Sequence, residues 1–144
     1  MLQGSLFKYG SRSANVAFKY GNHKTHAIMI GGLTDGFFAC GYVEPLSRAL
    51  DAHGISLVQT LLSSSYLGYG TVTLDQDAAE LRDLVTFLRE DEAMGGEGYA
   101  LIGHSTGTQD CVRFVRNAVR GDFDGDSGGA MALPFAVVLQ APVS

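Results

Sequence analysis

A serine in a glycine-bounded turn is the residue of this chain best suited to covalent chemistry. The pentapeptide Gly103-His104-Ser105-Thr106-Gly107 fits the pattern G-x-S-x-G, with an apolar segment at 99–102 before it and an amphipathic segment after it. In this strand–turn–helix context the pattern raises a nucleophilic serine above a sheet. Glycine is expected at 103 and 107 because larger side chains there would collide with neighbouring backbone. We predict Ser105 as a catalytic nucleophile; the alternative is a turn with an inert serine.

Two backbone amides are expected to stabilise the negative charge that this nucleophile creates. A helix that starts at Ser105 points its first amides at the site, so the Thr106 amide is one predicted oxyanion-hole donor. The Leu33 amide is the other, because the small residues of the loop 31–37 let the backbone approach a substrate; the alternative is a plain glycine turn. His104 is predicted to act in shape and hydrogen bonding, since adjacent side chains in such a bend point in different directions.

Motifs for phosphate or metal binding are incomplete. The glycine-rich loop lacks both the Lys-Ser/Thr of a P-loop and the spacing of G-x-G-x-x-G. The acidic segment 122–126 resembles a calcium loop, but Ser127 replaces the required glycine and Leu133 the required glutamate. His23 and His26 have no carboxylate partner motif and are expected to form a surface pair. We therefore expect no metal and no organic cofactor.

Apolar segments predict the elements that position these residues. Two β-like runs, 5–9 and 15–20, predict a pair at a sheet edge. From residue 27 the order is strand–helix three times and then strand, which predicts an α/β fold: a parallel sheet with right-handed crossovers and helices on both faces. The expected strands are 27–30, 55–59, 99–102 and 135–139. The expected helices begin at Pro45 and end before Gly54, begin after Thr73, and begin at Ser105.

Helical spacing also predicts which side chains face the core. Thr73 is the expected N-cap of the second helix, with Gln76 as its capping-box partner. The expected inward residues of that helix are Leu74, Ala78, Leu81, Val85 and Leu88, and the expected solvated ones are Asp77, Glu80, Asp83 and Glu90. In the third helix the expected inward residues are Val112, Val115, Ala118 and Val119, and the expected outward ones are Arg113, Arg116 and Arg120.

Composition restricts the class of protein and its partners. The 144 residues are 46 % hydrophobic and 17 % charged, which fits one domain or part of one. A net charge of −5 gives no electrostatic reason for binding nucleic acid or an anionic membrane. No apolar run could span a bilayer and no signal peptide is visible, so a soluble, cytoplasmic protein is expected. Cys40 and Cys111 are expected to be free thiols.

Three segments resemble an uncharacterised α/β-hydrolase family of fungi, plants and algae that includes a fungal siderophore esterase. They are 30–36, 101–110 and 138–144, and the likeness runs from about residue 5 to the end. The resemblance implies an eight-stranded α/β-hydrolase sheet and a Ser–Asp/Glu–His triad. It implies Ser105 as nucleophile, the Leu33 and Thr106 amides as oxyanion donors, and a small-molecule carboxylic ester as substrate, with hydroxamate siderophores as one class.

The chain lacks the remaining triad residues of that family. In this fold the acid and the histidine follow the serine in sequence, yet no histidine follows Ser105 and the later acids all precede the last predicted strand. We therefore expect both downstream of residue 144. A strand of the buried type near the end of the sequence supports the same expectation, because such a strand at an open edge invites aggregation. Residues 1–144 are thus predicted to be the N-terminal portion of one domain, C-terminally truncated at about the sixth strand and nearly inactive alone.

Three other functions stay open at this point. A non-catalytic binding module could retain the fold without the chemistry. An acyltransferase or thioesterase could use the same acyl-enzyme. A nucleotide-binding α/β domain would share the strand–helix order but would need a phosphate motif. The sequence leaves the oligomeric state open.

Overall fold

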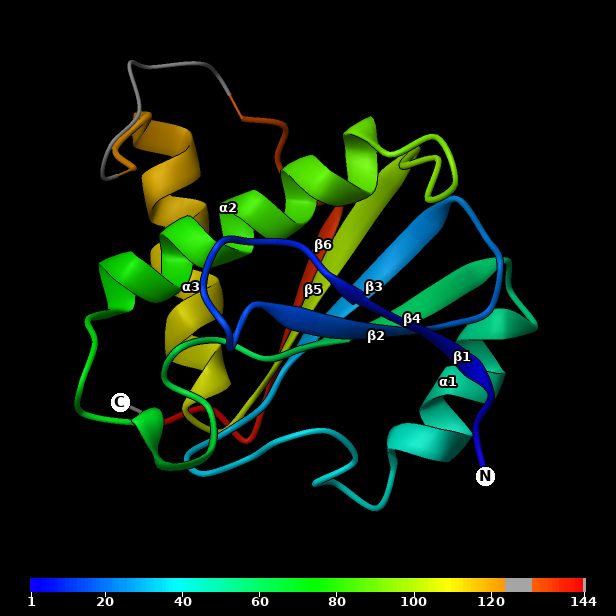
Figure 1. Ribbon diagram of the computed structural model, residues 1–144, viewed down its shortest axis with the longest axis horizontal. Coiled ribbons are helices and arrows are strands. Elements are labelled where there is room, and N and C mark those ends of the chain that lie inside the picture. The colour runs from blue at the N-terminus through cyan, green and yellow to red at the C-terminus, as the bar shows by residue number, and fades with distance from the viewer. Residues whose placement is uncertain (124–130, 144) are drawn as a thin grey trace.

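A single twisted sheet organises the chain. The computed structural model describes residues 1–123 and 131–143 (Figure 1). Six strands lie in the order β1-β2-β4-β3-β5-β6. Their bounds are Gly4–Lys8, Val16–Tyr20, Thr25–Ile30, Ile55–Thr60, Gly98–His104 and Ala136–Gln140 for β1 to β6. The predicted N-terminal pair and the four later strands are confirmed.

Strand directions match the predicted parallel sheet with an antiparallel edge. β1 pairs antiparallel with β2, and β2 pairs antiparallel with β4. β3 is parallel to β4 and β5, and β5 is parallel to β6. The three central strands are buried almost throughout, as their continuous apolar segments predict. β6 forms the other edge, and every one of its residues is exposed.

Helices cover both faces of the sheet, as predicted. They are α1 (Val43–Asp51), α2 (Leu74–Glu90) and α3 (Gly107–Arg120), with a short 3₁₀ turn, η1, at Tyr66–Gly68. The two core clusters that they cover divide the apolar residues of the sheet. One cluster joins α2 and α3 to residues such as Ile28 and Leu101; the other lies under α1 and includes Met29 and Leu57.

The helix ends show where local sequence rules hold. Thr73 caps α2, and its side chain accepts a hydrogen bond from the Gln76 amide at 3.1 Å. The expected return bond is wrong, because the Gln76 side chain donates to Glu80 instead. α1 begins at Val43, two residues before Pro45, so that Pro45 lies in its first turn. Gly54, with φ of +76°, follows α1 as its predicted stop.

Two predictions about helix faces are wrong. Asp77 and Glu80, expected in solvent, are 3 % and 4 % exposed, because they face the loop after β4 rather than water. On α3, Val112 and Val119 are exposed rather than inward. The inward positions of that helix are taken by Cys111, Phe114 and Ala118, with Asp110 and Asn117 beside them.

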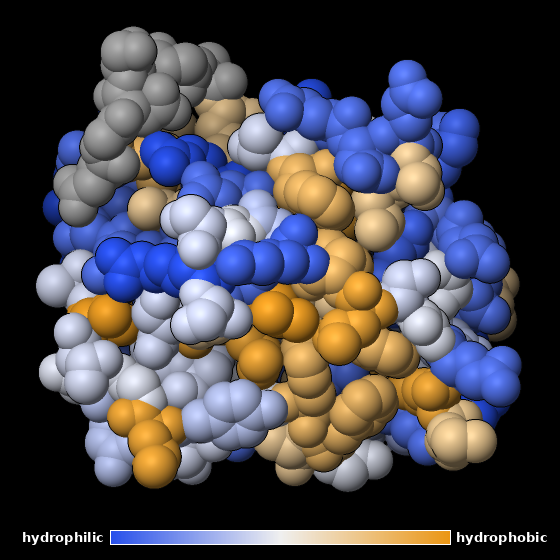
Figure 2. All heavy atoms as spheres, viewed as in Figure 1, coloured by the Kyte–Doolittle hydropathy of each residue, from blue (hydrophilic) through white to orange (hydrophobic). Residues whose placement is uncertain are grey.

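The surface combines apolar and charged regions. On the face seen in Figure 2, apolar side chains gather at the centre, in the region of β1 and β2 in Figure 1, with polar and charged side chains around them. No helix among the described residues is long and apolar enough to cross a membrane.

Candidate functional site

Ser105 sits in a sharp bend between β5 and α3. Its φ is +53°, the left-handed region that residues with a side chain rarely adopt. The Ser105 amide donates to the Gln140 carbonyl at the end of β6, at 3.0 Å. The Ser105 carbonyl accepts from both the amide and the hydroxyl of Thr108. Contacts on both sides thus hold a backbone conformation that costs about 1–3 kcal/mol in isolation.

Glycines on either side of Ser105 allow strand and helix to approach. A Cβ at Gly103 would lie 2.7 Å from the Gly107 carbonyl oxygen. A Cβ at Gly107 would lie 2.5 Å from the Gly31 carbonyl oxygen and closer still to that of Ile30. Real side chains do not tolerate such separations from backbone, so both positions need glycine for the reason the sequence predicts.

The loop after β3 passes directly beside the bend. A Cβ at Gly32 would lie 3.0 Å from the Ser105 Cβ. The loop is closed by two hydrogen bonds, from the Gly32 amide to the Asp35 carboxylate at 2.7 Å and from the Asp35 amide to the Gly32 carbonyl at 3.0 Å. Between them, Leu33 is exposed and Thr34 has φ of +66°.

The two residues that carry the predicted oxyanion donors line one pocket. Leu33 and Thr106 line a hollow of about 180 Å³, together with Gly31, Gly32 and residues of the loop after β4. In the part of the chain that the structure describes, neither the Leu33 nor the Thr106 amide donates to a protein acceptor. Both amides are therefore unoccupied by protein acceptors, which is one requirement for an oxyanion hole.

His104 contacts other side chains rather than Ser105. Its Nδ1 lies 3.0 Å from the Tyr42 hydroxyl and also contacts Oε1 of Gln140. The Tyr42 and His104 rings meet edge to face with centroids 5.9 Å apart. His104 thus joins the end of β5 to the start of α1 and the end of β6, in keeping with its predicted structural role.

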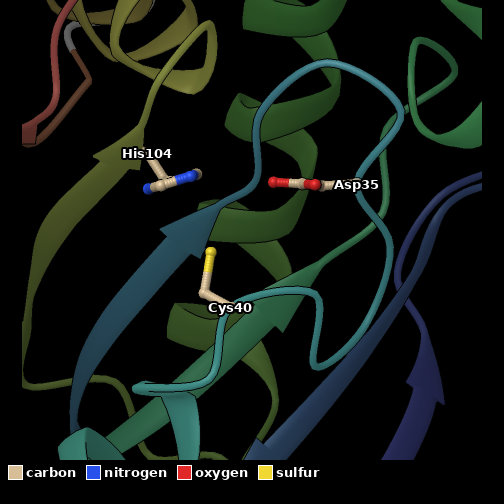
Figure 3. Close-up of side chains that lie close together, drawn as sticks. All are labelled: Asp35, Cys40 and His104. Atoms are coloured by element: carbon tan, nitrogen blue, oxygen red, sulfur yellow. The ribbon is translucent and has the colours of Figure 1, made fainter.

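Three side chains that can bind a metal converge near the end of β3, two from the loop after β3 and one from the end of β5. Asp35, Cys40 and His104 each offer a ligand atom, all within 4.8 Å of one another (Figure 3). The sequence gives no sign of this grouping, because Asp35 and Cys40 lie in the loop after β3 and His104 ends β5, far along the chain. Carboxylate, thiolate and imidazole together suit a divalent transition metal. An ion there would compete with the hydrogen bonds that Asp35 makes to Gly32 and His104 to Tyr42.

A buried carboxyl pair lies in the wall of the same pocket. Asp77 of α2 and Asp110 of α3 share a hydrogen bond, and Ser64 also bonds Asp77. Burial raises the pKa of Asp110 to about 8, and the neighbouring Asp77 adds to the effect. Burial likewise raises the pKa of Asp77 to about 6. The pair was not predicted from the sequence; the i, i+4 spacing of Thr106 and Asp110 is the one signal that places Asp110 beside the bend.

Replacing Asp110 with asparagine is expected to change how stability depends on pH. An unfolded aspartate has a pKa of about 3.9, so the raised folded value means that the native state holds the proton more tightly. The contribution of Asp110 to the free energy of unfolding is fully present below about pH 4 and is lost as the pH rises to about 8. Urea unfolding at pH 4.5, 6 and 8 should show Asp110→Asn gaining stability relative to wild type at each step.

Asp75→Asn is the matched control for that measurement. Asp75 lies on α2 and accepts hydrogen bonds from Asn117 and Arg113, which lower its pKa. Its contribution is present above the unfolded pKa and is lost in acid, so its removal should cost stability at pH 6 and 8. If the stability of Asp110→Asn relative to wild type changed with pH in the same direction as that of Asp75→Asn, the raised pKa of Asp110 would be contradicted.

The remaining sequence predictions have mixed outcomes. His23 is partly exposed and pairs with Asp51 at 2.8 Å. The expected surface position of His26 is wrong, since it is 1 % exposed within β3, and burial lowers its pKa to about 4. Cys40 and Cys111 are free thiols, as expected. Most of the acidic segment 122–126 lies outside the described residues.

Comparisons with known proteins connect this geometry to hydrolases. The sequence profile of a family described as "Protein of unknown function (DUF1749)" matches residues 2–144. "Fusarinine C esterase sidJ" of Aspergillus fumigatus is 36 % identical over 107 residues, covering 67 % of this chain and 30 % of that protein.

Solved structures give the same picture for the fold. "Siderophore hydrolase EstB from Aspergillus fumigatus" superposes with a TM-score of 0.82 at 29 % identity, covering 100 % of this chain and 44 % of that one. An "Alpha/Beta hydrolase fold protein of unknown function" has a TM-score of 0.70 at 22 % identity over 96 % of this chain and 44 % of its own, which shows the fold alone. The chain therefore spans less than half the length of each of these relatives.

Proposed function

This chain belongs to the DUF1749 family, and we propose that its 144 residues are the N-terminal portion of one catalytic domain of a serine esterase. Its architecture is that of the α/β-hydrolase fold. In the proposal Ser105 is the nucleophile, and the Leu33 and Thr106 amides form the oxyanion hole. The triad acid and histidine belong to sequence beyond Ser144, so the 144 residues alone are expected to be nearly inactive.

The proposed reaction passes through an acyl-enzyme. Ser105 Oγ attacks the ester carbonyl carbon while the histidine takes its proton, and the two amides stabilise the oxyanion. The intermediate collapses, the protonated alcohol leaves, and Ser105 stays acylated. Water, deprotonated by the same histidine, then releases the acid and restores the serine. The chemistry needs no metal or organic cofactor.

The observation that carries the proposal is the bend itself. Ser105 is held at a positive φ, and the loop that carries the Leu33 amide passes beside it at Gly32. Leu33 and Thr106, whose amides have no protein acceptor among the described residues, line one hollow next to the bend. Within the described residues no histidine hydrogen-bonds the Ser105 side chain. The missing base fits a histidine in the rest of a longer protein, since the relatives are more than twice as long.

Names of the relatives guide the proposed substrate class. These relatives are called Fusarinine C esterase and siderophore hydrolase, and we propose a small-molecule carboxylic ester as the substrate of this protein. Nucleic acid and membranes are not proposed partners. A cytoplasmic location stays a prediction.

A fluorophosphonate probe tests the nucleophile directly. We expect the full-length protein, meaning the longest chain that contains these residues, to be labelled on the peptide that carries Ser105, as mapped by mass spectrometry. Absence of labelling would favour a non-catalytic binding module with the same fold. Transfer of the acyl group to an added alcohol in preference to water would favour an acyltransferase.

Asp35→Ala is expected to slow catalysis without much change in substrate binding. The Asp35 carboxylate fixes the Gly32 amide, and with it the loop that presents the Leu33 amide. Complete loss of an oxyanion-hole donor costs about 10²–10³-fold in kcat. A donor that is only loosened should therefore cost about 10- to 100-fold. Steady-state kinetics should show this fall in kcat with KM within about twofold.

Asp35→Asn is the control for the loop. Its side-chain carbonyl can still accept the Gly32 hydrogen bond, so kcat should stay within about fivefold of wild type. Equal losses in the two variants would mean that charge, rather than loop geometry, is what Asp35 supplies.

A further inference from the structure

Asp35, Cys40 and His104 bring three different kinds of metal ligand to one point beside the Ser105 bend. One ligand atom from each lies within 4.8 Å of the other two. In Figure 3 the Cys40 sulfur points into the space between the Asp35 carboxylate and the His104 ring. All three side chains are half-buried, so an ion from solvent can reach them while the protein partly shields it.

The Asp35 carboxylate has no cationic partner in the part of the chain that the structure describes. Its one hydrogen bond there is with the Gly32 amide, at 2.7 Å. Charges taken out of water in proteins are usually paired or coordinate a metal, and a half-buried carboxylate gains from the same contacts. A divalent cation would supply the missing positive charge.

Tyr42 connects the other two ligands. Its hydroxyl lies 3.0 Å from Nδ1 of His104 and also hydrogen-bonds Cys40. Because Tyr42 directly precedes α1 and His104 ends β5, the two ligands are held between a helix and the sheet. Groups that hydrogen-bond metal ligands orient them, and their loss weakens metal binding by about 10- to 100-fold. Tyr42 is therefore a positioning residue of this cluster.

The ligand types favour zinc. Thiolate sulfur binds Zn²⁺ at about 2.3 Å, and imidazole nitrogen and carboxylate oxygen bind at about 2.0–2.2 Å, usually in a tetrahedron with neighbouring ligand atoms about 3.3–3.7 Å apart. The three side chains would therefore move together by about 1 Å to close on an ion, with water in the fourth position. The Cys40 thiol gives its proton to solvent as the sulfur binds. Calcium and magnesium prefer oxygen ligands and are not expected there.

An ion at the cluster would act on the loop of the oxyanion hole. The carboxylate that would bind the ion is the one that fixes the Gly32 amide. Coordination draws electron density from this carboxylate and pulls it towards the other two ligands, so its hydrogen bond to Gly32 weakens. Gly32 lies beside Ser105, and the next residue carries the Leu33 amide. Occupation of the cluster should therefore displace one oxyanion donor.

We propose that Asp35, Cys40 and His104 form a zinc site that inhibits the esterase when it is occupied. The ion has no role in ester cleavage itself. Metal binding stands on the cluster alone, whereas the inhibition rests on the proposed esterase function.

Cobalt absorption and steady-state kinetics test the site on the full-length protein. Co²⁺ binds the same kinds of site as Zn²⁺ and gives a sulfur-to-cobalt charge-transfer band only where a thiolate coordinates it. Titration of the metal-free protein with Co²⁺ should produce this band, and Zn²⁺ should remove it. Saturating Zn²⁺ should lower kcat by about 10- to 100-fold with little change in KM, the effect of a loosened oxyanion donor, and EDTA should restore kcat.

Three variants locate the effect. Cys40→Ala should abolish the band and raise the half-inhibiting Zn²⁺ concentration by more than about 100-fold, since loss of an outer partner alone costs 10- to 100-fold. Cys111→Ala is the matched control, because Cys111 is a free thiol buried in α3, and it should keep both the band and the inhibition. Tyr42→Phe should keep the band and weaken zinc binding about 10- to 100-fold. If a cysteine variant does not fold, Tyr42→Phe decides.

The outcomes distinguish this inference from the proposed function. Absence of the band in wild type, or its survival in Cys40→Ala, would overturn the site. Unchanged kcat in protein saturated with zinc would overturn the inhibition, and so would inhibition that persists in Cys40→Ala, since the inhibiting ion would then bind elsewhere. No ester hydrolysis by the metal-free protein, together with no fluorophosphonate labelling, would overturn the esterase proposal and leave the cobalt band as the test of the site.

Discussion

Ser105→Ala is expected to reduce ester hydrolysis by the full-length protein by about 10⁵–10⁶-fold in kcat. Loss of a nucleophile removes the acyl-enzyme route altogether, and what remains is binding and oxyanion stabilisation. Covalent labelling by a fluorophosphonate should disappear as well. KM should change little, because the substrate carbonyl still meets the Leu33 and Thr106 amides. Steady-state kinetics and mass spectrometry measure these effects.

Ser105→Gly is the informative second variant. It removes the hydroxyl and also the Cβ that makes a φ of +53° costly. We therefore expect it to be as inactive as Ser105→Ala but about 1 kcal/mol more stable to urea. Serine hydrolase activity that survives in both variants would assign the nucleophile elsewhere, and equal stability of the two would show that the bend stores little strain.

Local sequence chemistry was sufficient to predict the elements that carry Ser105. Continuous apolar segments predicted the buried strands, Thr73 predicted the start of α2, and the G-x-S-x-G pattern predicted the bend. These features depend on residues within a few positions of each other, so periodicity and turn chemistry reveal them. Family and fold followed from the same motifs.

Contacts between distant segments were beyond local rules. The sequence pattern predicts Asp77 on a polar, solvated helix face. It is buried because the loop after β4 and helix α3 lie against it. The pattern predicts Val112 as a core residue, but the side chains of α3 that face the core include those of Cys111 and Phe114 instead. His26 reads as polar surface until β3 takes the centre of the sheet. In each case the position of the residue in the folded chain, rather than its local sequence pattern, decided whether its side chain was buried.

Gly107→Ala is expected to destabilise the protein by about 3 kcal/mol and to reduce kcat by about 100-fold. One added methyl group would meet two backbone carbonyls, those of Ile30 and Gly31, at separations that atoms do not adopt. Neither carbonyl can turn aside like a flexible side chain, so β3 and α3 must move apart. That movement displaces Gly32 and the Leu33 amide from Ser105, and a shift of about 1 Å can cost 10²-fold in rate.

Gly41→Ala provides the matched control for that substitution. Gly41 lies near the end of the loop between β3 and α1, and a Cβ there would have no atom within 4 Å. Its unfolding free energy should stay within about 0.5 kcal/mol of wild type, with unchanged kcat. Urea unfolding and ester hydrolysis should thus separate the two glycines. A Gly107→Ala protein that is both stable and fully active would mean that strand and helix do not need their close approach, and the link between this bend and an oxyanion hole would be lost.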